Sequence, residues 1–222
     1  MSNNISWVVF GDLHSNPGPA DKIPEIREAE GICISGDLTN LGRSRDAERM
    51  LAALRELNPR VYAQMGNMDY PDVGEVLARQ DCNLHARGLE LHDGVGFMGL
   101  GWSNRTPFGT PAEVDDGQLR EWLEQAYEDV RDLQHLVLIS HTPPLNTGAD
   151  KIGSGEHVGS KSVREFIENV QPGICICGHI HEAVTDEYLG PTHVLNPGML
   201  SQGGYVLLSH TENGMAAELK RI

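Results

Sequence analysis

Short apolar runs that each end in a polar cluster recur along this chain. The five clearest runs are ISWVVF (5–10), GICIS (31–35), RVYAQM (60–65), HLVLIS (135–140) and GICIC (173–177). Each has the length of a strand, is bounded by Gly or polar residues and is mostly apolar, with frequent Val, Ile and Cys. The pattern predicts five buried strands, each followed by a polar loop.

Helical patterns lie between these runs, over residues 43–57, 115–133 and 160–170. Each begins near a Ser or Asp that suits a helix N-terminus. Strands that alternate with helices in this way predict an α/β fold with a largely buried sheet.

The rhythm changes in the last forty or so residues, where strand-like pieces are separated by Gly and Asn turns with no helix between them. This spacing predicts antiparallel hairpins, and residues 86–102 show the same pattern. We therefore expect two sheets, one mixed and one mainly antiparallel, with helices outside. With no repeat or long linker, the 222 residues are expected to form a single domain (1–222).

The net charge of the chain limits the classes of partner that it can bind. The formal net charge is -15, from 32 acidic and 17 basic residues. Such a surface repels polyanions, so we expect neither long nucleic acid nor a membrane as a partner. A small anion held by a local metal stays compatible with this charge, and the oligomeric state is left open.

The four cysteines, Cys33, Cys82, Cys175 and Cys177, lie mostly in apolar runs and are expected to be buried free thiols. The chain begins without a basic leader, and no apolar run approaches the roughly 18 residues of a membrane span. These features predict a reducing, cytoplasmic setting.

Oxygen and imidazole donors follow all five predicted strands. They are Asp12 and His14, Asp37, Asn67, His141, and His179 and His181. Ligands of open α/β sheets gather outside the carboxyl ends of the strands. Seven such donors exceed one tetrahedral site and suit two adjacent divalent ions bridged by one carboxylate, with Mn, Fe, Zn, Ni or Co all compatible. One DLH or HIH alone is more often a turn, but five strand ends together predict a metal site.

The motifs GDLH (11–14), GD (36–37), GNMD (66–69), SHTPP (140–144) and GHIH (178–181) resemble, in this order, the calcineurin-like metallophosphoesterase superfamily. The resemblance extends to NPG at 196–198. The stretches GWSNRTPFGTP (101–111), GEHVGS (155–160) and CGHIHEA (177–183) resemble its small prokaryotic branch.

This resemblance implies a four-layer α/β/β/α sandwich and a two-metal centre. By motif match, Asp12, His14 and His181 would hold one ion, and Asn67, His141 and His179 would hold the other. Asp37 would bridge the two ions. His179 and His181 lie two residues apart, so serving different ions would require a local bend between them.

Two such ions imply a reaction. A water that bridges them loses a proton near neutral pH and attacks phosphorus, while the ions polarise a phosphoryl oxygen. The sequence offers no GxSxG elbow and no Cys beside a His in a strand-end loop, so a protein nucleophile is not expected. We predict a dinuclear-metal hydrolase of a small phosphoester substrate.

Met68 departs from the family, which usually has His at this place as the acid or a phosphate contact. A thioether has no proton to give, and general acid catalysis is typically worth about 10² to 10⁴ in rate. Poor leaving groups would suffer most, so phosphodiesters are favoured over monoesters. The next residue, Asp69, is assigned either the orientation of a ligand or a simple turn.

A Gly-rich stretch, 148–161, follows the strand that ends at His141 and is expected to fold over the site. His157 within it is our candidate for the missing acid or for a phosphate contact, the alternative being a solvated loop His. Arg105 and Lys151 are candidate phosphate contacts, and Asn67 is a candidate substrate contact as well as a ligand.

Three other functions are compatible with the same fold or ligand types. A metallo-β-lactamase-type hydrolase would need Asp and His directly after HxH, where this chain has Glu182 and Ala183. A scaffold that has lost turnover would show degraded ligand positions, whereas all seven are present here. A phosphomonoesterase or protein phosphatase is the alternative within the enzyme class.

Overall fold

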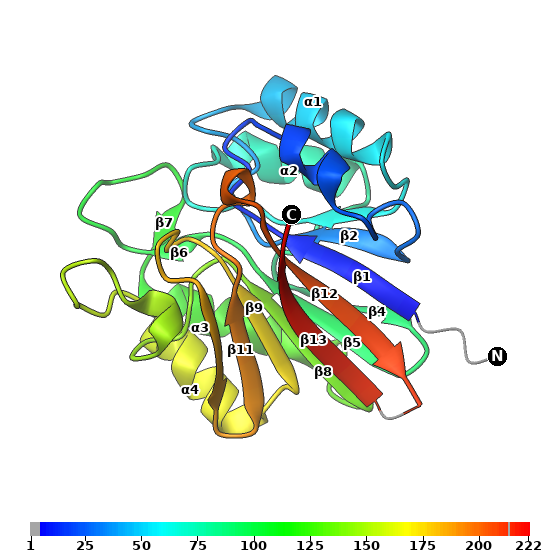
Figure 1. Cartoon of the computed structure of the whole chain (residues 1–222). Helices are drawn as coiled ribbons and strands as arrows, with labels where there is room; N and C mark the ends of the chain where they lie inside the picture. Colours follow the sequence, from blue (N-terminus) through cyan, green and yellow to red (C-terminus); the bar gives the residue numbers. More distant parts are fainter. Residues whose placement is uncertain (1–4, 213) are drawn as a thin grey trace.

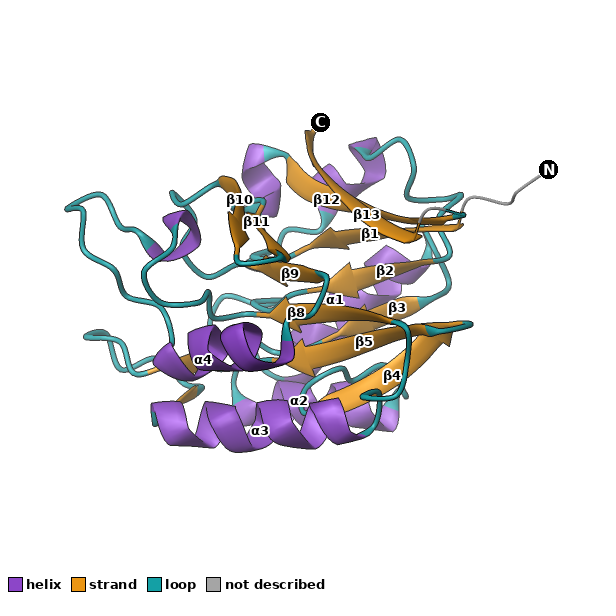
Figure 2. Cartoon of the chain, turned by 90° about the horizontal axis from the view of Figure 1, so that it is seen from below, coloured by secondary structure: helices purple, strands orange, loops and turns teal. Residues whose placement is uncertain are grey.

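Two β-sheets pack face to face, and helices cover their outer faces (Figures 1 and 2). The computed structural model describes residues 5–212 and 214–222. The four layers follow the order helix, sheet, sheet, helix, so the predicted α/β/β/α sandwich is confirmed.

The first sheet has five strands in the order β13-β12-β1-β2-β3. Its strands are β1 (Ile5–Phe10), β2 (Gly31–Ile34), β3 (Val61–Ala63), β12 (Gly204–Thr211) and β13 (Gly214–Arg221). The pairs β1–β2 and β2–β3 are parallel, whereas β12 runs antiparallel to both β1 and β13. The sheet is therefore mixed.

The second sheet has six strands in the order β10-β11-β9-β8-β5-β4. Its strands are β4 (Arg87–His92), β5 (Val95–Leu100), β8 (His135–Ser140), β9 (Ile174–Cys177), β10 (Thr185–Leu189) and β11 (Thr192–Asn196). Only its outer pairs, β4–β5 and β10–β11, are antiparallel. The prediction of a mainly antiparallel second sheet is wrong, because its three inner pairs are parallel.

A small parallel pair lies outside both sheets, formed by β6 (Ser103–Asn104) and β7 (Glu113–Val114). The four α-helices are α1 (Ser44–Arg55), α2 (Pro71–Arg79), α3 (Asp116–Glu128) and α4 (Lys161–Val170). Three 3-10 turns are η1 (Gly18–Lys22), η2 (Gly148–Asp150) and η3 (Leu200–Gln202).

Three helices were predicted and α2 was missed. Its Pro71 stands at the first helical position, where a missing N–H costs nothing, so the proline starts the helix. Ser160 caps α4 as expected, because its side chain accepts a hydrogen bond from the Val163 N–H at 3.1 Å.

Three apolar layers hold the sandwich together. The first packs α1 and α2 on the first sheet, and the third packs α3 and α4 on the second sheet. The middle layer lies between the sheets, where the Trp7 and Phe97 rings meet with their centroids 5.1 Å apart. Strands with both faces buried in this way explain the continuous apolar runs of the sequence.

Gln64 joins the two sheets beneath the loops that follow their strands. Its side chain is fully buried, and Nε2 lies within hydrogen-bonding distance of three carbonyls, those of Ser35 (3.2 Å), Leu100 (3.0 Å) and Ile139 (3.0 Å). Because these carbonyls belong to the ends of β2, β5 and β8, one amide fixes the spacing of both sheets at this edge.

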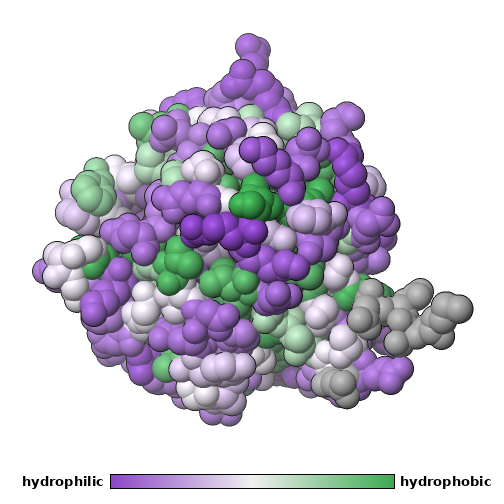
Figure 3. Space-filling view, in the orientation of Figure 1, coloured by the Kyte–Doolittle hydropathy of each residue, from purple (hydrophilic) through white to green (hydrophobic). Residues whose placement is uncertain are grey.

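All four cysteines are buried and unbridged, as predicted. Burial raises the pKa of the Cys175 thiol to about 12, so it behaves as an apolar side chain. In the space-filling view, hydrophilic side chains cover most of the face seen in Figure 1 (Figure 3). Over the described ranges 5–212 and 214–222, none of the helices combines the length and the apolar character that a membrane crossing requires.

Candidate metal centre

The seven predicted metal ligands lie in loops at one edge of the sandwich. Strands β1, β2 and β8 point the same way (Figure 2), and β3 and β9 run parallel to β2 and β8, so the loops that follow these five strands emerge on the same side. The structure brings together the side chains of Asp12, His14, Asp37, Asn67, His141, His179 and His181.

One group of donors consists of Asp12, His14 and His181. Nε2 of His181 lies 3.1 Å from Asp12 Oδ1 and 3.1 Å from Nε2 of His14. Nε2 of His14 is 3.9 Å from the same Asp12 oxygen. With Asp37, these residues each offer a donor atom within 4.8 Å of the others. Four donors from three loops therefore converge on one point.

The second group consists of Asn67, His141 and His179. Nε2 of His141 lies 2.9 Å from Oδ1 of Asn67. The rings of His141 and His179 have centroids 5.1 Å apart. His141 is completely buried and Asn67 is 5% exposed. This second group is as enclosed as the first.

Asp37 lies between the two groups. Its Oδ2 is 3.7 Å from His14 Nε2, and its Oδ1 is 3.6 Å from His141 Nε2. The Met68 N–H also donates to Oδ1 at 2.8 Å, which fixes the carboxylate plane. One carboxylate thus presents each of its oxygens to a different donor set.

The backbone at these ligands is held in a conformation that most residues avoid. Asp12, His14, Asp37 and His179 have φ angles of 52°, 46°, 51° and 68°. Non-glycine residues with such angles are uncommon and cluster at functional sites. The left-handed turn at His179 supplies the bend that allows His179 and His181 to face different donor groups.

A glycine makes room for the central carboxylate. A Cβ on Gly66 would lie 2.2 Å from Asp37 Oδ1 and 2.6 Å from His141 Cε1. The GNMD motif therefore requires glycine at its first position because the loop passes directly against two candidate ligands.

The protonation states suit cation binding. Burial lowers the pKa of His141 to about 3 and that of His179 to about 4, so both rings are neutral and keep a free lone pair. Burial works against ionisation of Asp12, but the hydrogen bond from His181 and the neighbouring imidazoles outweigh it and lower its pKa.

Asp37 behaves differently from Asp12. Burial, together with the charges of Asp12 and Asp69, raises the pKa of Asp37 well above its usual range. Buried carboxylates that repel one another in this way are stabilised by a shared cation.

The donors fit divalent first-row ions. Nitrogen and oxygen ligands bind such ions at about 2.0–2.2 Å, so two ligands at right angles on one ion lie about 3 Å apart. Two pairs in the first group and the Asn67–His141 pair have this spacing, at 3.1, 3.1 and 2.9 Å. No thiolate stands among the seven residues, which suits Mn, Fe, Zn, Ni or Co.

Asp69 does not face the candidate ligands with its side chain. It is fully buried and accepts hydrogen bonds from the N–H groups of Leu38, Thr39 and Gly66 and from the Thr39 hydroxyl, at 2.6–3.1 Å. Burial raises its pKa to about 6, against these hydrogen bonds. Asp69 thus ties the Asp37 loop to the Asn67 loop, and its catalytic role stays a prediction.

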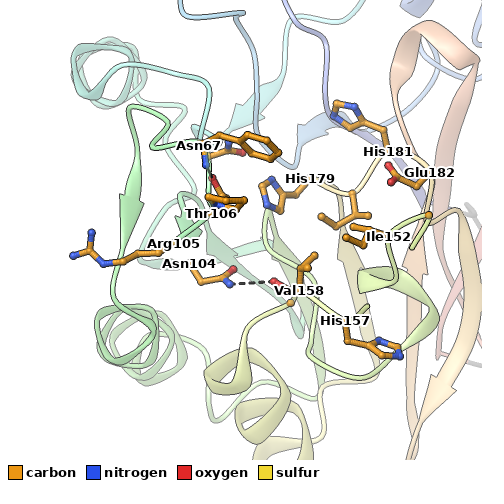
Figure 4. Close-up of a pocket in the computed structure, with 15 residues that line it drawn as sticks. Asn67, Asn104, Arg105, Thr106, Ile152, His157, Val158, His179, His181 and Glu182 are labelled. Carbon is orange, nitrogen blue, oxygen red and sulfur yellow. Dashed lines mark hydrogen bonds between the residues drawn. The ribbon is translucent and has the colours of Figure 1, made fainter. Parts of the chain in front are cut away.

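A cavity of about 700 Å³ opens beside the two groups (Figure 4). Asn67, His179 and His181 contribute to its wall, and the loops 104–108 and 152–159 form its rim. The two loops are tied together where Asn104 Nδ2 donates to the Val158 carbonyl at 3.1 Å. A molecule that enters this cavity reaches three of the candidate ligands.

The three loop residues predicted to contact phosphate do not point at the ligands. Arg105 lines the cavity, but its guanidinium extends away from the centre (Figure 4) and pairs with Asp115 at 2.7 Å. His157 is turned outward, and its Nδ1 lies 2.6 Å from the buried carboxylate of Asp150. Lys151 is exposed and is not part of the cavity wall. Their roles stay predictions.

Two residues next to this centre were missed. Nδ2 of Asn67 donates to Oγ1 of Thr110 at 2.9 Å, and that hydroxyl donates to Oε1 of Glu113 at 2.5 Å. Thr110 lies 43 residues from Asn67 along the chain. Nothing in the strand-end pattern that identifies the ligands indicates this contact.

Comparisons with known proteins find relatives of this chain in sequence and in fold. The family model of the calcineurin-like phosphoesterases matches residues 5–183. An uncharacterized protein of Methanocaldococcus jannaschii is 35% identical over 202 residues, which cover 89% of each chain.

Two more distant similarities are also found. A probable cyclic nucleotide phosphodiesterase of Synechococcus is 26% identical over 162 residues, covering 71% of this chain and 60% of that protein. The crystal structure of a Thermus thermophilus protein superposes with a TM-score of 0.71 at 18% identity, over 96% of this chain and 98% of that one, and shares the fold.

Proposed function

Because this chain belongs to the calcineurin-like phosphoesterase family, we propose that it hydrolyses phosphoester bonds with two divalent metal ions and prefers phosphodiesters to phosphomonoesters. The family membership supports the hydrolysis of phosphoesters. The number of ions and the preference for diesters rest on the residues around the candidate centre.

The position of Asp37 carries the proposal. Its two oxygens lie 3.7 and 3.6 Å from His14 and His141, which belong to different donor groups. A carboxylate between two sets of neutral imidazoles and oxygens favours two ions that share it as a ligand. A single ion would leave one of the sets without a cation.

Two ions bound here would lower the pKa of a water and stabilise the charge that develops on a phosphoryl group. The chain itself would hold and orient the reactants. Its buried ligand loops are fixed by Asp69 and by Gln64, and neither can shift without breaking several hydrogen bonds. Asn67, His179 and His181 line both the centre and the cavity, so they would lie next to a bound phosphoryl group.

Two features of the chain support a preference for diesters. Met68 offers no proton to a leaving group, so esters with good leaving groups or strained rings lose least. Arg105 is the only lysine or arginine among the described residues that line the cavity, and its guanidinium is paired with Asp115.

The charge of the substrate also favours a diester. A phosphomonoester carries more negative charge than a diester, and this chain has a net charge of -15. The apolar side chains of Ile152, Val158 and Ile180 line the cavity and suit a second ester group in place of a charged oxygen. The similarity to a probable cyclic nucleotide phosphodiesterase points in the same direction.

A pair of substrates with one leaving group tests the proposal. The Mn²⁺-loaded protein is assayed with bis(p-nitrophenyl) phosphate and with p-nitrophenyl phosphate, and kcat/KM is measured for both. We expect the diester to be favoured at least about tenfold, which corresponds to about 1.4 kcal/mol. Asp37→Asn, which removes the shared carboxylate oxygen, should abolish both activities.

Two outcomes would contradict different parts of the proposal. An equal or higher kcat/KM for the monoester would overturn the preference for diesters. If the chain bound two ions and hydrolysed neither ester, it would be a scaffold on this fold.

A further inference from the structure

The amide of Asn67 has two ends, and only one of them can serve as a metal ligand. Its Oδ1 carries lone pairs, whereas its Nδ2 is a donor that cannot bind a cation. Oδ1 faces Nε2 of His141 at 2.9 Å, and Nδ2 faces Oγ1 of Thr110 at 2.9 Å. A flip of this amide would turn an N–H₂ group towards the ion.

Glu113 stands at the other end of this contact. Its carboxylate accepts four hydrogen bonds, from the N–H and the hydroxyl of Thr106 (3.1 and 2.6 Å) and from the N–H and the hydroxyl of Thr110 (2.7 and 2.5 Å). Burial opposes its ionisation, but these hydrogen bonds outweigh burial and lower the pKa of Glu113 to about 2. At neutral pH the carboxylate therefore only accepts.

The direction of each hydrogen bond then follows. The Thr110 hydroxyl has one proton, and it goes to Glu113. Its oxygen can only accept from Asn67, so the group that faces it must be the Nδ2 donor. Oδ1 is left on the side of His141. The Glu113 carboxylate, two hydrogen bonds away, thus decides which end of the Asn67 amide faces the centre.

We propose that Glu113 and Thr110 form a one-way hydrogen-bond chain that holds the Asn67 carbonyl oxygen towards the second metal ion. They are positioning residues, because they reach the ion only through Asn67. The inference rests on the two-metal centre of the proposed function. It is tested by measuring ion binding, not hydrolysis. Residues that orient metal ligands in this way typically change metal affinity about 10- to 100-fold when they are replaced.

Matched variants of Thr110 test the chain. Thr110→Val has nearly the same shape but no hydroxyl, and Thr110→Ser keeps the hydroxyl without the methyl group. Mn²⁺ binding to the metal-free protein is measured by calorimetry. We expect Thr110→Val to weaken the second ion about 10- to 100-fold, with the first ion unchanged, and we expect Thr110→Ser to bind both ions within about threefold of the original protein. Glu113→Gln, whose amide can also donate, should weaken the second ion as well.

The same substitution made in an Asn67→Asp variant distinguishes orientation of the amide from simple support of the loop. In Asn67→Asp both ends of the side chain are oxygens, so there is no amide to orient. Adding Thr110→Val to Asn67→Asp should then leave the affinity for the second ion unchanged or raise it. A loop-support role predicts the same loss in both backgrounds.

Three results would overturn the proposal: full affinity in Thr110→Val, an equal loss in Thr110→Ser, or the same loss in the Asn67→Asp background. Binding of fewer than two ions by the unaltered protein would overturn the two-metal centre along with it. If the unaltered protein bound two ions but hydrolysed no phosphoester, the proposed function would be wrong and the proposed orientation of Asn67 would be unaffected.

Discussion

Replacing Gly66 by alanine should strongly weaken metal binding. The added Cβ would lie 2.2 Å from Asp37 Oδ1, whereas real Cβ contacts are essentially never shorter than 3.0 Å, so the two atoms must separate by at least 0.8 Å. Metal–ligand distances hold within about 0.2 Å. The displacement is several times this tolerance and affects the one carboxylate placed to serve both ions.

We therefore expect Gly66→Ala to weaken Mn²⁺ binding by at least about 100-fold, in line with the upper range for residues that only orient ligands. The backbone at Gly66 does not have a positive φ, so alanine is conformationally allowed there. Calorimetric titration measures the affinity, and denaturant unfolding monitors the fold.

Gly117→Ala is the matched control, because a Cβ at this position in α3 meets nothing within 4 Å. It should bind both ions normally and gain a few tenths of a kcal/mol up to about 1 kcal/mol in unfolding free energy. If Gly66→Ala also bound two ions with unchanged affinity, Asp37 would not be the shared ligand that we describe.

Three further predictions follow from individual residues. Met68→His should raise kcat/KM for poor leaving groups more than for good ones, up to about 10²-fold; a uniform loss across a leaving-group series would contradict this. Gln64→Met should lower the free energy of unfolding by about 2–4 kcal/mol in denaturant titrations, since the buried side-chain amide no longer donates to the carbonyls around it, of which that of Leu100 keeps the His141 N–H as a donor; a change under 1 kcal/mol would be inconsistent with the bridge between the sheets. Burial lowers the pKa of His85 to about 4 from its ordinary 6.5. As the pH falls from 6.5 to 4, His85 therefore takes up a proton in the unfolded chain but not in the folded chain. The contribution of His85 to the free energy of unfolding is complete above pH 6.5 and declines by about 3 kcal/mol towards pH 4. His85→Asn keeps an acceptor for the Gly101 N–H and should flatten this decline; an unchanged slope would show that His85 is not its cause.

The cluster of candidate ligands was accessible from sequence because it obeys a simple rule. Polar donors that follow buried parallel strands meet at one edge of the sandwich, where β1, β2 and β3 of the first sheet and β8 and β9 of the second sheet end, and these five strand ends are readable without a structure. The hairpin over 86–102 also follows from local signals, and it forms as β4 and β5.

The rest depends on contacts that local patterns do not specify. Alternation along a strand indicates which face is buried but not which strand is its neighbour, so the C-terminal hairpins could not be assigned to sheets. They divide, with β10–β11 in the second sheet and β12–β13 in the first. The Thr110–Glu113 pair reaches Asn67 through a loop, and no periodicity marks such a contact.

The outward orientation of His157 has a similar cause. The sequence places a titratable ring in a Gly-rich loop, but the buried Asp150 seven residues before it determines where the ring points. A charged partner inside the same loop competes with the site for a side chain, and the outcome depends on geometry.

Activity measured against bound metal is the most direct test of a centre that works with two ions. Mn²⁺ is added stepwise to the metal-free protein, and hydrolysis of bis(p-nitrophenyl) phosphate is followed as a function of ions bound per chain. We predict a rate that reaches its plateau at two ions per chain. Full activity with one ion or none, or no hydrolysis with two ions bound, would contradict it.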